Sequence, residues 1–129
     1  SIKAYPDTNF HVIFPPYSRF LYSLWKNKNP YKYQLYLETV RYLVFEGAKY
    51  NNLTIYSFDE MAYLNNLNNY RDMRHYGTDM NKVMLTSIAD KKSIINIENI
   101  EAFIASIDSK NSNYKLDEEL NYLLNSYKR

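Results

Sequence analysis

Cysteine is absent from this chain, so structural disulfides and thiolate metal sites are excluded. Long apolar runs are absent too, since no stretch approaches the roughly 20 residues that a membrane helix needs. Neither charge sign dominates, because the formal net charge is only +2. A nucleic-acid groove binder concentrates Lys and Arg on one face, so the sequence supplies no basis for nucleic acid as a partner.

Tyrosine and asparagine, by contrast, are abundant. The 129 residues include 15 Tyr and 16 Asn, while the hydrophobic share of 46% is ordinary for a globular protein. High Tyr and Asn usage is more typical of an AT-rich genome than of an aromatic platform for sugars. A chain of this length fits one domain, so we expect residues 1–129 to form a single globular unit.

The spacing of apolar residues predicts two strands joined by helices. Phe10–Phe14, closed by two prolines, indicates a buried strand, and Leu53–Phe58 alternates in the manner of a second strand. Between them, Ser18 is a natural N-cap for a helix to about Lys26, and a longer helix is expected from Tyr31 to about Lys49. Two strands joined by a long helical crossover are most simply parallel neighbours.

Further helices are expected on the carboxyl-terminal side. One begins at Thr78 or Asp79, and the chain beyond residue 90 is predicted to be helical throughout, interrupted by a polar linker at 108–113. The predicted class is α/β: a partial flavodoxin-like parallel sheet with flanking helices over residues 1–90, and a helical extension over 91–129. The side chains expected to be buried on these helices include Leu35, Leu43, Phe45, Ile97, Ile100, Phe103, Ile104 and Ile107.

Asp72 and His75 are the residues best suited to chemistry. An Asp that accepts a hydrogen bond from His Nδ1–H fixes the tautomer and leaves Nε2 free to take a proton. In open α/β sheets, ligands bind outside the carboxyl ends of the strands. We therefore expect the loop after Phe14 and the loop that carries Asp72 and His75 to face one crevice.

These segments together resemble the SGNH (GDSL-type) hydrolases. The resemblance rests on Phe14-Pro15-Pro16-Tyr17-Ser18 after a strand, on Tyr56-Ser57-Phe58-Asp59, and on Tyr70-Arg71-Asp72-Met73-Arg74-His75-Tyr76 before a helix. It covers about residues 6 to 90 and is nearest to the envelope-associated acyltransferase branch. The resemblance implies His75 as general base and acid, and Asp72 as its orienting partner, in acyl transfer through a serine.

The amino-terminal half of that family has no counterpart here. Its Gly-Asp-Ser nucleophile box and its oxyanion residues are missing, because Gly47 and Gly77 lie in no such box. With no initiator Met, the start of the chain also suggests the interior of a longer protein. We therefore expect the carboxyl-terminal part of a larger SGNH-like domain, inactive alone, whose partner is the missing amino-terminal half or another copy. Its substrate would be an acylated carbohydrate or a small ester, and the resemblance suggests a cell-envelope location.

Other candidate residues have weaker support. Ser18 lies at a strand end and is better explained as a helix cap than as a substitute nucleophile, while Tyr17 and Arg74 are candidate substrate contacts. His11, within an apolar strand, is expected to be a satisfied core or edge histidine, and no metal or cofactor is expected. The alternative function is a non-catalytic binding or interaction module in which Asp72 and His75 pin a loop.

Overall fold

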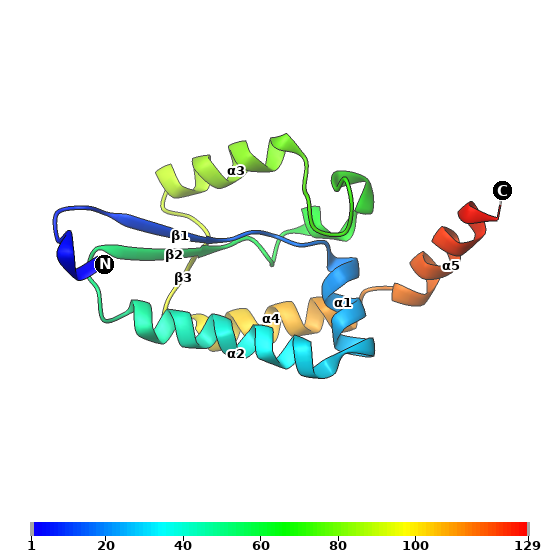
Figure 1. The fold of residues 1–129 in the computed structure, drawn as a ribbon, viewed down its shortest axis with the longest axis horizontal. Coiled ribbons are helices and arrows are strands. Elements are labelled where there is room, and N and C mark those ends of the chain that lie inside the picture. The colour runs from blue at the N-terminus through cyan, green and yellow to red at the C-terminus, as the bar shows by residue number, and fades with distance from the viewer. Residues whose placement is uncertain (1, 129) are drawn as a thin grey trace.

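A computed structural model describes residues 2–128 as a mixed α/β fold with five α-helices and a three-stranded mixed sheet. The strands are β1 (Phe10–Phe14), β2 (Leu53–Ser57) and β3 (Ile94–Ile95). The helices are α1 (Arg19–Lys28), α2 (Pro30–Gly47), α3 (Thr78–Ala89), α4 (Ile100–Ser112) and α5 (Leu116–Tyr127), with 3₁₀ turns at Ile2–Ala4, Ala62–Asn65 and Leu67–Asn69. As Figure 1 shows, α3 covers one face of the sheet, α2 and α4 cover the other, and α5 projects away from the body.

The sheet has the order β1-β2-β3. The predicted parallel pairing is confirmed, with Phe10 opposite Leu53 and Phe14 opposite Ser57. The prediction of a buried first strand is wrong, however, because β1 lies at the sheet edge and His11 and Val12 are exposed. A strand with a neighbour on only one side keeps part of its surface in water.

The third strand was not predicted from the sequence. Ile95 pairs with Ile55 in an antiparallel ladder, so the chain beyond residue 90 is not helical throughout. The turn into β3 uses left-handed backbone at Lys91 (φ 54°) and Ser93 (φ 60°). A two-residue strand is too short for a period of two to be visible in the sequence, which explains the error.

Local capping explains where the first two helices begin. Ser18 has extended backbone and accepts a hydrogen bond from the Leu21 N–H, as the prediction of an N-cap required. The Asn29 side chain caps α2 by accepting from the Lys32 N–H, and Pro30 occupies the first turn. The N-cap of α3 was expected at Thr78 or Asp79 but is Gly77, so no side chain caps this helix.

The side of α2 that faces the core is narrower than predicted. Leu35, Leu43 and Phe45 are 50%, 37% and 53% exposed, while Ile97, expected on the same stripe as Ile100, lies in the turn before α4 and is 53% exposed. A helix bounded by one sheet and one neighbour buries a single stripe, so apolar residues outside that stripe stay in water. The residues that α2 buries are Tyr33, Leu37, Val40, Val44 and Gly47.

The helix α4 is longer than predicted, since it continues through the expected polar linker to Ser112. Two polar residues in this segment find partners on other helices: partly exposed Asp108 binds Lys26 at 2.6 Å, and buried Asn111 donates to the Tyr33 hydroxyl at 2.9 Å. Only residues 113–115 separate α4 from α5.

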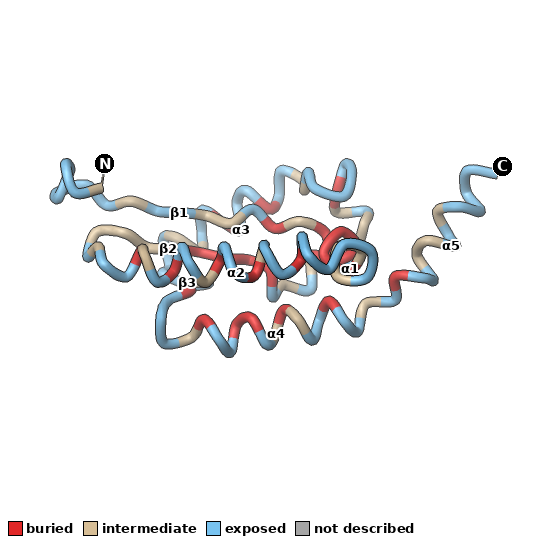
Figure 2. The backbone as a smooth tube through the Cα atoms, turned by 60° about the horizontal axis from the view of Figure 1, so that its bottom comes forward, coloured by how far each residue is buried: buried red, intermediate tan, exposed pale blue. Residues whose placement is uncertain are grey.

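The core has two parts, one on each face of the sheet. The larger joins α1, α2 and α4 to the sheet, and the smaller joins α3 to it through Tyr56, Phe58, Met80 and Met84. Buried positions follow the inner sides of α2 and α4 in Figure 2, whereas α5 is mostly exposed. No helix within residues 2–128 has the combined length and apolar character that a membrane crossing requires.

Candidate functional site

Asp72 and His75 form a hydrogen-bonded pair on the surface. The distance from His75 Nδ1 to Asp72 Oδ2 is 2.6 Å. The other carboxylate oxygen of Asp72 accepts the backbone N–H groups of Arg74 (2.7 Å) and His75 (2.9 Å). One aspartate therefore holds both the local turn and the imidazole that the turn carries.

The charge state of Asp72 determines the tautomer of this pair. The His75 side chain and the two backbone N–H groups hold the pKa of Asp72 well below its usual range, because all three stabilise the carboxylate. An ionised carboxylate can only accept hydrogen bonds. In the neutral imidazole Nδ1 then carries the proton and donates to Asp72, which leaves the Nε2 lone pair free to accept a proton.

A short backbone ladder closes the base of the loop. Tyr70 and Tyr76 form an antiparallel bridge, and the Arg71 N–H donates to the His75 carbonyl at 2.7 Å. The Gly77 N–H donates to the Asn69 carbonyl at 2.9 Å just before α3 begins. The loop therefore leaves and re-enters the body at adjacent points.

The same loop is attached to the carboxyl end of β1. Both the backbone N–H and the hydroxyl of Ser18 donate to the Met73 carbonyl, at 3.1 and 2.8 Å. The Tyr70 hydroxyl donates to the Pro16 carbonyl at 3.2 Å. In Figure 1 the loop that precedes α3 and the start of α1 lie at the same end of the sheet.

The other predicted site residues differ in how accessible they are. Ser18 is fully buried, and its hydroxyl both caps α1 and contacts Met73, so its observed contacts are structural. Tyr17 packs against Tyr22 and Trp25 as part of the larger core. Arg74 is exposed, and its backbone N–H donates to Asp72.

The second histidine, His11, lies away from this loop. His11 is exposed on the edge strand, with its ring 5.7 Å from the ring of Tyr56, and so belongs to the predicted edge class. Across residues 2–128, no cluster of three or more His, Asp or Glu side chains has the arrangement of a metal site.

Sequence reasoning missed a buried polar network beneath this loop. Arg19 is 1% exposed, and its guanidinium donates to the Asn65 side chain at 3.2 Å and the Asn111 side chain at 3.0 Å. It also donates to the Asp59 carbonyl at 2.7 Å. An arginine after a helix cap is usually solvated, but Arg19 shares one side of α1 with Tyr22 and Ser23, which are buried with it.

Asp59 is the acidic member of this network. Its carboxylate accepts the hydroxyls of Tyr22 (3.0 Å) and Tyr36, and it is 1% exposed. Burial raises the pKa of Asp59 to about 6, although the two tyrosines and nearby Arg19 stabilise the charged form. Its position in the sequence could have indicated this role, because Asp59 is an acidic residue directly after the predicted strand Leu53–Phe58.

The comparisons with known proteins assign no family to this geometry. No protein-family model, curated protein or solved structure matches the chain.

Proposed function

We propose that this chain is the carboxyl-terminal portion of an SGNH-like serine esterase or O-acyltransferase that acts on acylated envelope carbohydrate. In this proposal His75 is the general base and acid, and Asp72 orients it. The observation that carries the proposal is the 2.6 Å contact from Nδ1 to Oδ2, made by a carboxylate that two backbone N–H groups also hold in place. An ionised Asp that fixes the Nδ1–H tautomer is the arrangement that proton transfer from a serine requires.

The position of the pair supports the same proposal. The loop is attached at Ser18 and Pro16, directly beyond the carboxyl end of a parallel strand, where α/β enzymes place their catalytic groups. His75 is exposed, so Nε2 is accessible to a group brought in from outside. In this proposal Arg74 contacts the acyl group that reacts. The proposal also includes a flavodoxin-like parallel sheet, of which this chain would supply a part.

The nucleophile is proposed to come from a strand that adds to β1. Within the described chain β1 pairs only with β2, so the N–H and C=O groups on its other side are open to a further strand. The segment Phe10–Phe14 contains neither proline nor a formally charged side chain, so it lacks the usual protection of an edge. A parallel strand on this side would end close to His75, and the missing amino-terminal half is the proposed source.

An ester-hydrolysis assay tests this function. The 129-residue chain alone is expected to show no serine-dependent turnover of p-nitrophenyl acetate, whereas a polypeptide extended upstream of Ser1 is expected to be active. In the extended protein, His75→Ala should abolish turnover, and Asp72→Asn should lower kcat by about 10²- to 10⁴-fold. Arg71→Ala, in the same exposed loop, is the matched control and should leave the activity unchanged.

Two results would count against the proposal. Robust serine-dependent turnover by the short chain would show that the nucleophile lies within it, and Ser18→Ala would then identify or exclude Ser18. Unchanged turnover in the His75→Ala variant of an active extended protein would remove His75 from the mechanism.

The exposure of the pair favours a second candidate, a non-catalytic binding module. The side chains of His75 and Asp72 are 75% and 53% exposed, as expected for residues that only stabilise a turn. A hollow of about 240 Å³, lined in part by Ser57, Asn99 and Phe103, offers a binding volume elsewhere. This candidate predicts an inactive extended protein whose ligand binding is unaffected by His75→Ala.

A further inference from the structure

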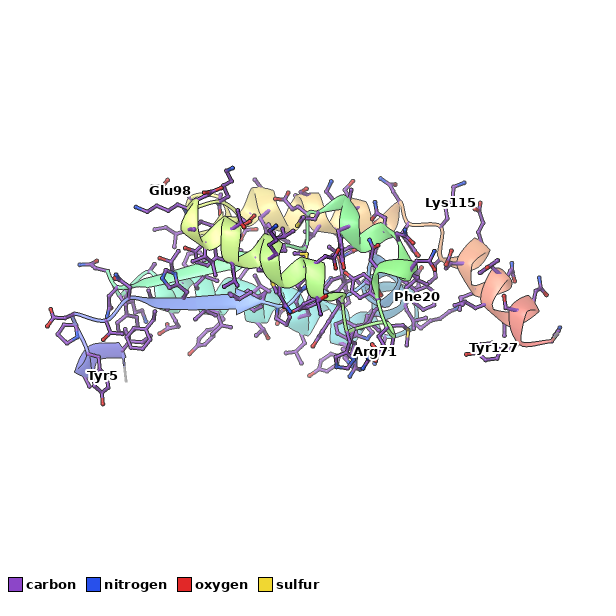
Figure 3. The ribbon with its side chains drawn as sticks, turned by 90° about the horizontal axis from the view of Figure 1, so that it is seen from above. Tyr5, Phe20, Arg71, Glu98, Lys115 and Tyr127 are labelled. Atoms are coloured by element: carbon purple, nitrogen blue, oxygen red, sulfur yellow. The ribbon has the colours of Figure 1, made fainter. Side chains whose placement is uncertain are left out.

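The last helix carries an apolar stripe that its own chain does not cover. In Figures 1 and 3, α5 leaves the body between Lys115 and Tyr127 and runs away from it. Leu116 is its only buried residue within the described chain, whereas Leu124 is 59% and Tyr127 89% exposed. An amphipathic helix of this kind normally buries its stripe against a partner. The uncovered stripe consists of Leu120, Leu123, Leu124 and Tyr127, because Leu116, at the start of the same face, is already buried within its own chain.

A second uncovered stripe lies on the outer face of α2, opposite the side that packs on the core. Tyr31 and Leu35 are 78% and 50% exposed, and Tyr42 and Phe45 are 63% and 53% exposed, with Glu38 between them. Residues spaced by three, four, seven and eleven positions share one face of a helix. The large exposed side chains of α2 therefore lie on one face of the helix, in two groups separated by Glu38.

The two stripes match in spacing. Leu120, Leu123 and Tyr127 stand at the same intervals along α5 as Leu35, Glu38 and Tyr42 along α2. If the helices packed in parallel, Leu120 would be level with Leu35 and Tyr127 with Tyr42, and Leu123 would be level with Glu38. Close helix packing requires the side-chain ridges of one helix to enter the grooves of the other.

The charges that flank the stripes favour the parallel orientation. Three acids begin α5, namely Asp117, Glu118 and Glu119, and Lys128 follows its end. Beside the stripe of α2, Lys32 lies in the first turn and Glu46 in the last. Parallel packing places the acids of α5 near Lys32, whereas at the other end Glu46 already pairs with Lys49 at 2.6 Å and so does not distinguish the two orientations.

The direction of the helices identifies the occupant as a second copy. In Figure 1, α5 departs from the end of the molecule where α2 begins and runs away from α2, so it does not lie on the α2 of its own chain. A two-fold axis perpendicular to α2 reverses the direction of the partner's α2, which then runs along α5 in parallel. A closed dimer of this type makes the same contact twice.

We propose that the chain forms a two-fold dimer in which α5 of each copy lies along the outer face of α2 of the other. The apolar stripes supply the attraction, and the acids of α5 opposite Lys32 select the orientation. The proposal is independent of the chemistry at His75, because neither helix carries that residue.

Sedimentation velocity over a concentration series tests the dimer. We expect reversible dimerisation with a dissociation constant on the order of 10 µM, as for a small interface. Leu120→Glu in α5 and Tyr42→Glu in α2 should each weaken dimerisation by at least about 100-fold, because each places charges in both copies of the contact. Leu85→Glu on α3, where Leu85 is 68% exposed, is the matched control and should not change the constant.

A charge exchange tests the orientation. Lys32→Glu and Glu118→Lys should each weaken the dimer by about tenfold, and the double variant should return to near the original constant. A chain that stays monomeric at about 100 µM would overturn the proposal, since this lies well above the expected constant. A dimer unaffected by Leu120→Glu and Tyr42→Glu would overturn it too, and a double variant weaker than either single variant would overturn the parallel orientation.

Discussion

Two polar clusters lie near the carboxyl end of the β1 strand, and they differ in nearly every physical respect. The Asp72–His75 pair is exposed and is held by bonds within one loop. The network around Arg19 and Asp59 is buried and joins α1, α4 and the segment after β2. Exposed ion pairs contribute little to stability, whereas leaving buried polar groups without their hydrogen-bond partners is costly. The more extensively bonded cluster therefore stabilises the fold, and the Asp72–His75 pair is left accessible to solvent.

The largest expected effect is the loss of the buried arginine. Arg19→Met should lower the free energy of unfolding by about 3–5 kcal/mol, because Asn65, Asn111 and Asp59 lose the group that satisfies them. Denaturant titration measures this change. Arg71→Met in the exposed loop is the control and should stay within about 0.5 kcal/mol of the parent protein. Equal effects of the two variants would show that burial does not distinguish the clusters.

A pH effect at Asp59 should be the next largest. The pKa of Asp59 is raised from 3.8 to about 6 in the folded protein. At a pH between these two values, Asp59 is protonated in the folded state and ionised in the unfolded state. The unfolding free energy should therefore fall as the pH rises from about 4 to 6, by at most about 3 kcal/mol from this group. The difference between Asp59→Asn and the parent protein isolates this contribution. Parallel stability profiles for the two proteins would contradict it.

The third prediction concerns the residue that links the two clusters. Ser18 caps the helix that carries Arg19 and binds Met73 in the loop of the pair. Ser18→Ala should cost about 1–2 kcal/mol of unfolding free energy through the lost cap and the lost contact. It should also speed amide hydrogen exchange in the loop around Met73. Ser126→Ala, in the exposed last turn of α5, is the control. An equally small effect of the two substitutions would show that Ser18 does not connect α1 to the loop around Met73.

The smallest global effect is expected at the exposed pair. Asp72→Ala should leave the unfolding midpoint unchanged, because the pair lies on the surface. It should speed exchange of the Arg74 and His75 amide hydrogens by about five- to tenfold, as expected when one hydrogen bond is lost. A clear drop in the midpoint would show that this loop supports the core.

Much of the architecture could be predicted from local signals. The cap at Ser18 and the parallel pairing of Phe10–Phe14 with the second strand follow from capping and crossover rules, and the long helix begins at Pro30, one residue before the predicted start at Tyr31. The strand at Ile94–Ile95 did not follow, because two residues carry no periodic signal. The continuation of α4 to Ser112 was missed because the polar residues there find partners on α1 and α2, far away in sequence.

For the candidate site, the sequence by itself determined the local unit. Asp72 and His75 are three residues apart, so a single turn brings the carboxylate to the imidazole and to two backbone N–H groups. Only the tertiary structure decided that this turn is attached through Ser18 to the end of β1, that Arg19 and Asp59 are buried beneath it, and that β1 and α5 are left uncovered. Hydrogen bonds within a turn depend on neighbours in the chain, whereas burial depends on residues up to 92 positions apart that the fold brings together.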